Sequence, residues 1–390
     1  MTREELIQSF YQVFGKRNGA PVTVFSPGRV NLIGEHTDYN GGHVFPAALT
    51  IGTYFAARKR KDRVLRFFSG NFPKNGIVER TLDKPEFDAK KGFSNYLMGM
   101  VWAYEKRLGL TADAGMDLYL WGNIPNASGL SSSASVEVGM GKILNVLFGF
   151  DVPNLEVALT GQYAENRYNG VNCGIMDQFA IAMGKKDQAM FLDTATLDFR
   201  YVPVALSGMK IVISCTNKKR GLADSKYNER RSECETALAE LRTKKDVQSL
   251  GELTPEEFEA IKDAIRDPVR MCRARHAVYE NERTVKAVGL LNAGDIEGFG
   301  KLMNASHVSL RDDYEVTGIE LDTLAEESWK IDGVIGARMT GAGFGGCAVA
   351  IVKDEAVETY IEKVGAAYEA KIGYPASFYV VEIGDGTDVY

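Results

Sequence analysis

The sequence predicts an α+β fold, in which strands and helices occupy different regions instead of alternating regularly. Three observations lead to this prediction. The first half of the 390-residue chain mixes strand-like runs with a few helical ones, the second half begins with one strand and continues in long amphipathic helices, and the chain ends as strand, helix, strand. This order does not match the regular βαβ repeat of a parallel sheet.

The strands of the first half are runs of β-branched, aromatic and aliphatic residues. They are expected at Pro21 to Phe25, Ile51 to Ala56, Val64 to Phe68 and Met116 to Trp121. A helix is expected to begin at Ala134, because apolar residues then recur every three or four positions, at Val136, Met140, Ile143, Leu144 and Leu147.

The second half opens with an expected strand from Met209 to Ser214. A Thr254-Pro-Glu-Glu257 capping box marks the start of one of the helices that follow. The apolar faces of these helices carry Cys234, Leu238, Leu241, Phe258, Ile261 and Ile265.

The end of the chain predicts a small strand, helix, strand unit. Gly346 to Val352 is a strand-like run, and Asp354 to Ile372 has the apolar spacing of a helix that Gly373 ends. A last strand follows from Phe378 to Ile383. Such a unit fits a small domain of the split βαβ kind.

Length and pattern together predict two domains. At roughly 150 residues per domain, the chain is long enough for two or three folding units. The change of pattern near residue 205 predicts an N-terminal domain over residues 1–205 and a C-terminal domain over residues 206–390. No Pro/Ser-rich linker separates them, so the two domains are expected to pack closely.

Charge and composition exclude several classes of protein. The chain has 46 Lys and Arg against 52 Asp and Glu, a net charge of -6, which repels a polyanion, so no nucleic-acid partner is expected. No run approaches ~18 apolar residues, and the first residues lack a signal-peptide core, so a cytoplasmic chain without membrane partners is expected. The cysteines are odd in number, far apart and without a C-x-x-C pair, so free thiols are expected at Cys173, Cys215, Cys234, Cys272 and Cys347.

The segment from Ile124 to Ser135 is a loop of small residues between an expected strand and an expected helix. Unpaired backbone N–H groups and the positive end of the dipole meet at a helix N-terminus, and small side chains let an anion approach them. The segment therefore predicts a phosphate site, and its hydroxyls supply oxygen ligands of the kind that Mg²⁺ binds. A solvated turn capped by Ser132 or Ser133 is the structural alternative.

Polar side chains and glycines are interleaved between Gly28 and Gly42. Glu35, His36 and Asp38 supply acceptors and a donor within four residues, which suits the hydroxyls of a polyol, and Arg29 can bring positive charge to the same place. The structural alternatives are a surface ion pair, a satisfied turn histidine and a glycine hairpin. His36 and His43 lie seven residues apart and lack further nearby ligands in a metal pattern, so no zinc site is expected.

The segment Gly341-Ala-Gly-Phe-Gly-Gly346 satisfies G-x-G-x-x-G. A dinucleotide-binding turn opens a helix early in a βαβ unit, whereas this segment leads into a strand near the end of the chain. A turn that lets backbone approach a ligand, or an ordinary connecting loop, explains these glycines better. No G-x-x-x-x-G-K-[ST] occurs either, which disfavours a Walker-type ATPase.

Taken together, four stretches resemble the signatures of galactokinases in the GHMP small-molecule kinase family: Gly28 to Gly42, Gly129 to Ser135, Asn172 to Gln178 and Arg338 to Cys347. The resemblance runs over essentially the whole chain. It implies a two-domain GHMP kinase fold, with an N-terminal domain like domain 2 of ribosomal protein S5 and a ferredoxin-like C-terminal domain. ATP and the sugar would meet in the cleft between them.

The resemblance also implies roles for single residues. Asp177 matches the catalytic aspartate and Arg29 the arginine that stabilises the transition state. The sugar-binding positions are Glu35, His36, Thr37, Asp38, Asp177 and Tyr227, and the Mg²⁺ ligands are Ser133 and Glu165. The nucleotide-binding positions are Ser69, Ala127, Ser128, Gly129, Leu130, Ser131, Ser132 and Ser133. Taken singly, Asp177 could also cap its helix, Glu165 could be solvated and Tyr227 could be ordinary packing.

The implied reaction is ATP-dependent phosphorylation of α-D-galactose at its C1 hydroxyl to give α-D-galactose 1-phosphate and ADP, in the Leloir pathway of galactose catabolism. Mg²⁺ is the implied cofactor, and a monomer is expected. A kinase for N-acetylgalactosamine is the nearest alternative. A sugar sensor that binds without turnover is another, although such sensors resemble kinases that lack a Ser-Ala pair, which is intact here as Ser133-Ala134.

Overall fold

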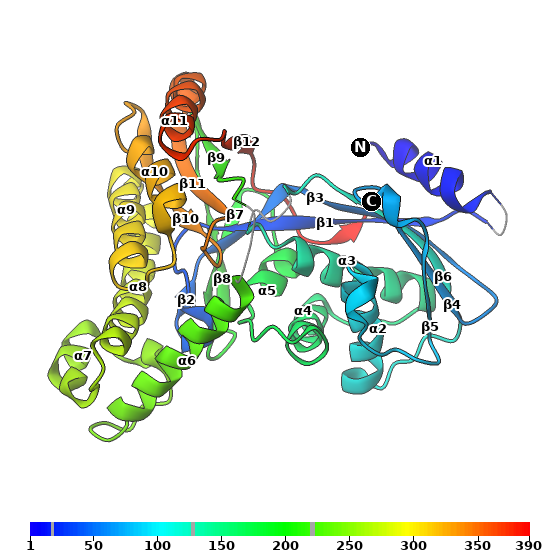
Figure 1. Ribbon diagram of the computed structural model, residues 1–390, viewed down its shortest axis with the longest axis horizontal. Coiled ribbons are helices and arrows are strands. Elements are labelled where there is room, and N and C mark those ends of the chain that lie inside the picture. Colours follow the sequence, from blue (N-terminus) through cyan, green and yellow to red (C-terminus); the bar gives the residue numbers. More distant parts are fainter. Residues whose placement is uncertain (17–18, 126–128, 219–222) are drawn as a thin grey trace.

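The computed structural model describes residues 1–16, 19–125, 129–218 and 223–390, and within these ranges the strands form three sheets (Figure 1). Helices and strands are segregated, so the predicted α+β class is confirmed. The short helices between the main elements are η1 (Asp38–Asn40), η2 (Pro73–Asn75), η3 (Ala89–Lys91), η4 (Glu165–Asn169), η5 (Leu250–Glu252), η6 (Lys262–Ala264) and η7 (Asp354–Ala356).

The first sheet has the strand order β13-β1-β3-β6-β4-β5. Its strands are β1 (Val22–Asn31), β3 (Pro46–Lys59), β4 (Val64–Ser69), β5 (Val78–Thr81), β6 (Met116–Gly122) and β13 (Asp388–Val389). The helices of this half are α1 (Arg3–Phe14), α2 (Ser94–Leu108), α3 (Ser132–Phe148), α4 (Asn154–Ala164) and α5 (Met176–Met183). Three of the four strands expected in the first half lie within β3, β4 and β6, and the fourth overlaps β1 but begins one residue before it. Helix α3 begins two residues earlier than expected.

Both faces of this sheet are covered, because alternate residues of a strand point in opposite directions. On β3, Phe55 and Ala57 belong to the core that includes α2 and α3, whereas Tyr54 and Ala56 pack with Leu6 of α1. Figure 1 shows α1 and α3 on opposite sides of the sheet. This arrangement holds the N-terminus of α3 next to the end of β1.

The second half contains a four-stranded sheet, β10-β11-β9-β12, packed against helices. Its elements are β9 (Met209–Cys215), α6 (Ala223–Leu241), α7 (Pro255–Ile261), α8 (Pro268–Asn292), α9 (Ile296–Asp312), α10 (Gly318–Ser328), β10 (Val334–Thr340), β11 (Cys347–Lys353), α11 (Val357–Ile372) and β12 (Ser377–Val381). Strands β11 and β12 both pair antiparallel with β9, so they run parallel to each other on either side of it. This is the split βαβ unit that the sequence predicts.

Local signals in the second half are accurate to within three residues, the largest difference being α11, which begins at Val357 instead of Asp354. Thr254 and Glu257 form the expected capping box, and Gly373 ends α11 in a left-handed conformation with a φ of 91°. The last strand ends at Val381 instead of Ile383.

The two halves are joined by sheet pairing as well as by packing. A third sheet links β2 (His43–Val44) with β7 (Gln188–Asp193) and β8 (Phe199–Pro203). At the end of the chain β13 returns to the first sheet and pairs with β1. The proposed division near residue 205 falls between β8 and β9, and the last residues therefore cross it.

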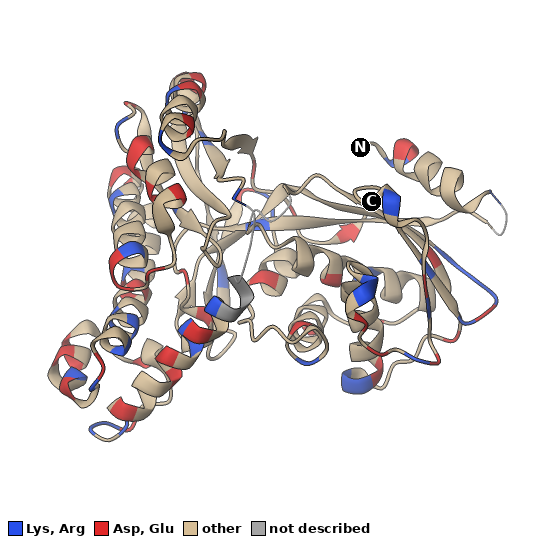
Figure 2. Cartoon of the chain, viewed as in Figure 1, with Lys and Arg blue, Asp and Glu red and all other residues tan. Residues whose placement is uncertain are grey.

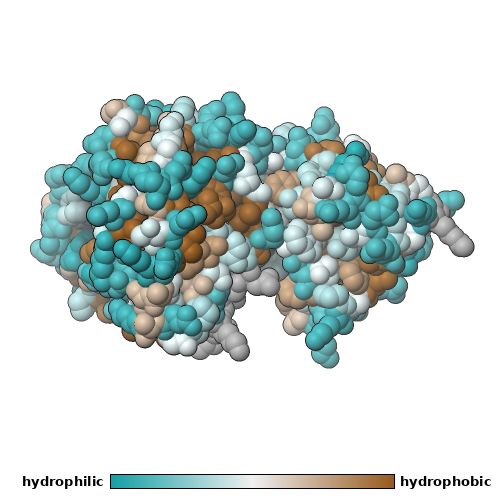
Figure 3. All heavy atoms as spheres, turned by 90° about the horizontal axis from the view of Figure 1, so that it is seen from above, coloured by the Kyte–Doolittle hydropathy of each residue, from teal (hydrophilic) through white to brown (hydrophobic). Residues whose placement is uncertain are grey.

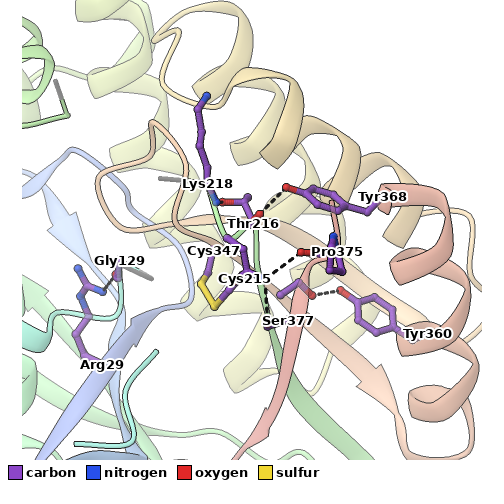
Figure 4. Close-up of a disulfide and its surroundings, with 12 residues drawn as sticks. Arg29, Gly129, Cys215, Thr216, Lys218, Cys347, Tyr360, Tyr368, Pro375 and Ser377 are labelled. Atoms are coloured by element: carbon purple, nitrogen blue, oxygen red, sulfur yellow. Dashed lines mark hydrogen bonds between the residues drawn. A yellow bond between two sulfur atoms is a disulfide. The ribbon is translucent and has the colours of Figure 1, made fainter. Parts of the chain in front are cut away.

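The expectation of free thiols is wrong for Cys215 and Cys347, which form a disulfide although 132 residues separate them (Figure 4). They are direct partners in the antiparallel pairing of β9 with β11, and this register brings their side chains together. The prediction of free thiols was wrong here because it relied on the separation of the cysteines along the chain. Among the described residues, Cys173, Cys234 and Cys272 are free thiols.

The described surface is mixed in charge and polarity. Lysines and arginines are interspersed with aspartates and glutamates along the helices (Figure 2). Seen from above, the molecule narrows between two lobes, and hydrophilic residues surround scattered hydrophobic patches (Figure 3). In the described ranges, no helix combines the length and apolarity needed to cross a membrane.

Candidate active site

Two cavities meet at the N-terminus of α3. The first, about 190 Å³, is lined by Arg29, Asp177 and Ser133 and by residues of the loop between β1 and β2. The second, about 550 Å³, lies over the first sheet and is also lined by Ser133. Tyr96 and Val171 complete the border between the two cavities.

Arg29 and Asp177 form a closed ion pair in the first cavity. Arg29 lies on β1 and is 3% exposed, and its Nη2 is 2.7 Å from Oδ1 of Asp177, at the start of α5. Its Nε donates to the same oxygen over 2.8 Å. The hydroxyl of Ser131 donates to the other oxygen of Asp177, so three donors orient this carboxylate.

The phosphate loop predicted from sequence is held by backbone contacts. The N–H of Arg29 donates to the carbonyl of Leu130, and its guanidinium donates to the carbonyl of Gly129. A Cβ on Gly341 would lie 2.6 Å from that same Gly129 carbonyl, so the third glycine-rich loop packs on the first only because it lacks a side chain there. Ala127 and Ser128, also predicted here, lie outside the described residues.

Ser131 stands at the N-cap of α3 in a left-handed conformation, with a φ of 59°, and makes no side-chain capping bond. The structural alternative, a turn capped by Ser132 or Ser133, therefore does not describe this helix start. A helix N-terminus without a side-chain cap keeps its first N–H groups directed at the cavity, which suits an anion.

Glu35 is fixed by groups from the end of the chain. Its Oε1 accepts from the backbone N–H of Gly341 over 2.8 Å and from Nη1 of Arg338 over 3.4 Å. Arg338, on β10, is completely buried, and its Nη1 also donates to the carbonyl of Asn31.

The backbone of the same loop is held by α8. Glu280 accepts from the N–H groups of Gly34 and Glu35, at 3.0 and 3.4 Å, and pairs with Arg283 over 2.7 Å. His276 donates from Nε2 to the carbonyl of Glu35. Burial alone would raise the pKa of Glu280, but Arg283, His276 and Arg338 lower it to about 2.

His36 has a left-handed backbone, with a φ of 61°, and a buried ring that lines the first cavity. Its Nδ1 lies 2.7 Å from the hydroxyl of Tyr39, and its Nε2 has no hydrogen-bond partner. Burial, followed by the charge of His276, lowers its pKa to about 3. The ring is therefore neutral near pH 7.

Asp38 also lines the first cavity, close to Asp177. Burial, then the carboxylates of Asp177 and Glu35, raise its pKa to about 7. A Cβ on Gly174 would lie 1.9 Å from Oδ2 of Asp38, so a side chain at position 174 would displace this carboxylate. Asp38 is thus a directional group that can accept or donate near neutral pH.

Thr37 does not line the cavity, unlike the other predicted residues of its loop. It is completely buried, and its hydroxyl lies 2.8 and 2.7 Å from the carbonyls of Gly34 and His43. Its contacts stabilise the loop that carries Glu35, His36 and Asp38.

The remaining predicted residues divide between the two cavities. Tyr227, on α6, lines the first, with its ring 5.6 Å from that of His36. Ser69, at the end of β4, and Ser132 line the second. The side chain of Leu130 is buried in a hydrophobic core, so this residue contributes to the predicted phosphate loop through its backbone.

Glu165 and Ser133 both line the first cavity and carry hard oxygen donors. Among the described residues, no group of three or more His, Cys, Asp or Glu side chains could hold a metal ion. Mg²⁺ commonly takes only one or two protein ligands together with phosphate oxygens and water, so a hydroxyl and a carboxylate beside a phosphate loop fit it.

Sequence reasoning missed Glu137, which is completely buried beside the predicted metal site. Asn169 donates to both Glu137 and Glu165, and Gln178 donates to Glu137 over 3.0 Å. Burial, then Glu165, raises the pKa of Glu137 well above its usual range. Its place four residues after Ser133, on the same face of α3, is the signal that could have found it.

Other missed residues of the first cavity are Tyr96, Cys173, Gly174, Met176, Gln178 and Ala342. Cys173 and Gln178 belong to the Asn172 to Gln178 motif of the sequence, but nothing in that motif indicates which of its side chains face a cavity. Tyr96 follows no recognised signal and reaches the site only through the packing of α2.

Comparison with known proteins agrees with this geometry. Family models match residues 8–59 as a galactokinase galactose-binding signature, 95–185 as a GHMP kinase N-terminal domain and 287–370 as a GHMP kinase C-terminal domain. A galactokinase of Ligilactobacillus salivarius is 55% identical over 389 residues and covers both chains completely, and one of Clostridium acetobutylicum is 59% identical over 93% of each chain.

The chain belongs to the galactokinase family. The sequence resemblance and the GHMP kinase fold are thereby confirmed, and the chain is an enzyme, a galactokinase, that transfers a phosphoryl group to a galactose hydroxyl.

Solved structures agree with this assignment. The crystal structure of Lactococcus lactis galactokinase complexed with galactose matches with a TM-score of 0.97 and 52% identity over 99% of each chain. A mevalonate kinase of Methanococcus jannaschii, 18% identical with a TM-score of 0.67, shares the fold.

Proposed function

We propose that this galactokinase phosphorylates the C1 hydroxyl of α-D-galactose with ATP, giving α-D-galactose 1-phosphate and ADP. The observation that carries the proposal is the junction of the two cavities at Ser133, with Arg29 and Asp177 beside it. Galactose would occupy the first cavity, among Glu35, His36 and Asp38. ATP would occupy the second, with its phosphates at the N-terminus of α3.

The chemistry of the two cavities supports this division. Carboxylates and an imidazole line the first, which suits a ligand with many hydroxyls. The second is lined by the rings of Phe72, Phe87 and Phe93, which suit a nucleobase. A terminal phosphoryl group at the junction would then lie next to a sugar hydroxyl, and such proximity supplies much of the rate enhancement of an enzyme.

Asp177 would accept the C1 hydroxyl proton as that oxygen bonds to the terminal phosphorus and the bond to ADP breaks. Arg29 would neutralise charge on the transferred group while its ion pair orients Asp177. The transition state of phosphoryl transfer is usually loose, so this orientation matters more than complete proton abstraction. A positioned base typically contributes ~10²–10⁴-fold. Mg²⁺ held by Ser133 and Glu165 would neutralise phosphate charge.

Coupled ADP release by the purified chain with Mg-ATP and a panel of hexoses tests the proposal. Galactose should be the best substrate, and phosphorus NMR of the product should show a sugar 1-phosphate. Galactose binding without ADP release would instead indicate a sensor, and better turnover of N-acetylgalactosamine would indicate a different GHMP kinase.

Asp38 is the principal candidate for sugar specificity, because a buried carboxylate is left unpaired by a sugar that lacks the right hydroxyl. Equal efficiency with glucose and galactose would contradict this assignment. We further propose a cytoplasmic monomer whose partners are galactose and ATP. Sedimentation at enzymatic concentrations tests the monomer.

A further inference from the structure

Glu137 is a completely buried carboxyl side chain close to the junction of the two cavities. It lies on α3, one turn after Ser133, in the region where α3, α4 and α5 pack on one another (Figure 1). It lines neither cavity, so it is not in a position to touch a ligand. A buried carboxyl group loses its hydration, which costs folding stability unless neighbouring groups replace the lost water. The contacts that replace it therefore indicate what this side chain does.

The two oxygens of Glu137 accept hydrogen bonds from one residue of each cavity. Oε2 accepts from Nε2 of Gln178 over 3.0 Å, and Gln178 lines the first cavity. Oε1 accepts from Nδ2 of Asn169 over 3.3 Å, and Asn169 lines the second cavity. One carboxyl group thus joins a wall of the first cavity to a wall of the second.

Both partners of Glu137 adjoin groups that the proposed function assigns to the reaction. Gln178 directly follows Asp177 at the start of α5. Nδ2 of Asn169 also donates to Oε2 of Glu165 over 3.1 Å. The path from the proposed base to the proposed metal ligand therefore runs through a single buried side chain.

The packing around this contact leaves Gln178 little freedom. Gly161 lies within α4, where glycine is an unfavourable residue. A Cβ at this position would lie 3.1 Å from Cγ of Gln178, closer than ordinary van der Waals contact. The absence of a side chain at position 161 therefore makes room for Gln178 to reach Glu137.

We propose that Glu137 is a positioning residue for phosphoryl transfer: it fixes the placement of Asp177 on the sugar side relative to Glu165 on the phosphate side. The inference rests on the proposed function for the roles of Asp177 and Glu165. The rate depends steeply on such a placement, since a displacement of about 1 Å can cost ~10²-fold. Binding of each ligand depends on it much less, because Glu137 lies outside both cavities.

The test compares Glu137→Met with Glu137→Gln. Methionine is similar in size and removes both acceptor oxygens, whereas glutamine keeps the length of the side chain and one oxygen. Three quantities are measured: kcat by coupled ADP release, the Kd of galactose by calorimetry without ATP, and the Kd of Mn²⁺ in the presence of ADP by electron paramagnetic resonance.

Tyr104→Phe is the matched control. Tyr104 is 1% exposed and lies outside both cavities, and its hydroxyl donates to the carbonyl of Gly141 on α3 over 3.0 Å. The control therefore removes a buried hydrogen bond to the same helix without touching the contacts of Glu137.

We expect Glu137→Met to lower kcat about 10²-fold, while the Kd values of galactose and Mn²⁺ each change less than about threefold. Glu137→Gln should recover most of the lost rate, because it still holds an amide partner. Tyr104→Phe should lower the Tm without a selective loss of kcat.

Gly161→Ala disturbs the same contact without removing any of its hydrogen-bonding groups, and alanine suits the interior of a helix. It should give a smaller but equally selective loss of kcat, and it keeps the test decisive if Glu137→Met does not fold.

Full turnover by Glu137→Met, or by Gly161→Ala where the methionine variant does not fold, would overturn the inference. Loss of galactose or Mn²⁺ binding in proportion to kcat would also overturn it, because Glu137 would then support a cavity and not a placement. A Glu137→Gln variant as slow as Glu137→Met would assign the effect to charge instead. The proposed function fails separately, since a wild-type chain that binds galactose but releases no ADP would contradict it before any variant is compared.

Discussion

The first cavity, proposed for the sugar and called the sugar cavity below, shares a border with the second, proposed for the nucleotide and called the nucleotide cavity, but the two are built in different ways. The sugar cavity combines residues of the first half with Tyr227, Gly341 and Ala342 of the second. The described residues that line the nucleotide cavity all lie between Thr53 and Val171.

The side chains in and around the two cavities also differ. Around the sugar cavity the charged groups Glu35, Arg338 and Glu280 are at most 1% exposed and bonded to one another or to the loop backbone. At the nucleotide cavity, Phe72 and Phe87 are 45% and 50% exposed. Recognition of a small polyol needs directional groups held rigidly in a dry site, whereas a helix N-terminus and aromatic rings can hold a nucleotide with local chain alone.

The largest effect is expected where the two cavities meet. Asp177→Asn should lower kcat at least ~10²-fold, equivalent to ~2.7 kcal/mol of barrier, because the amide cannot accept the proton. Coupled ADP release measures kcat, and thermal unfolding should show nearly normal folding. A folded variant with full turnover would remove Asp177 from the mechanism.

Removing the support of the sugar loop should affect galactose and not ATP. Glu280→Gln leaves Arg283 without its buried carboxylate, which should cost about 3 kcal/mol of unfolding free energy and raise the KM for galactose. The KM for ATP should stay constant. Asp117→Asn is the matched control, because Asp117 is a buried partner of Arg58 outside both cavities. Equal changes in the KM for galactose and the KM for ATP would contradict the claim that Glu280 supports only the sugar cavity.

The contribution of Glu280 should also depend on pH in a defined direction. Its pKa is lowered to about 2 in the folded chain, so its stabilising contribution is present above the unfolded value of ~4.5 and is lost as the pH falls towards 2. The stability difference between wild type and Glu280→Gln should therefore narrow in acid. Denaturant titration at several pH values measures this difference, and a constant difference would contradict the assignment.

On the nucleotide side, Ser133→Ala should raise the Mg²⁺ concentration for half-maximal turnover about tenfold, the effect of one polar contact. Galactose binding without ATP should not change. Ser132→Ala is the matched control, because Ser132 lines only the second cavity. An unchanged Mg²⁺ dependence would count against Ser133 as a ligand.

The smallest effect concerns the loss of folding stability caused by the buried charge of Asp38 in the sugar cavity. The pKa of Asp38 is raised to about 7, so between pH ~4 and 7 the folded chain binds more protons than the unfolded chain, and stability falls as the pH rises. Asp38→Asn removes this penalty. The Tm of the variant relative to that of wild type should therefore be a few degrees higher at about pH 8 than at about pH 5. A Tm difference independent of pH would show that Asp38 is not destabilised by its neighbours.

Local signals predicted the elements of the fold well. The split βαβ unit at the end of the chain, the capping box at Thr254 and four of the six strands of the first sheet follow from periodicity and turn chemistry within about 20 residues. Strands β5 and β13 were not predicted. The disulfide between Cys215 and Cys347 could not be predicted in this way, because it depends on the register of two strands that are distant in sequence.

The candidate site divides along the same line. Arg29, Glu35, His36, Asp38 and Asp177 could be named from the sequence because their motifs are short and continuous. The contacts of Ser131 with Asp177, of Arg338 with Glu35 and of Glu280 with the loop backbone could not, since only folding brings these partners close.

The amino-acid sequence by itself determined the family, the secondary structure and the chemical groups available for the reaction, because each of these is written in local patterns of side chains. Only the tertiary structure decided which groups face a cavity and which support them. Burial and neighbouring charge set the pKa of Asp38 and keep His36 neutral. Both the burial and the charge come mainly from residues that are distant in the sequence.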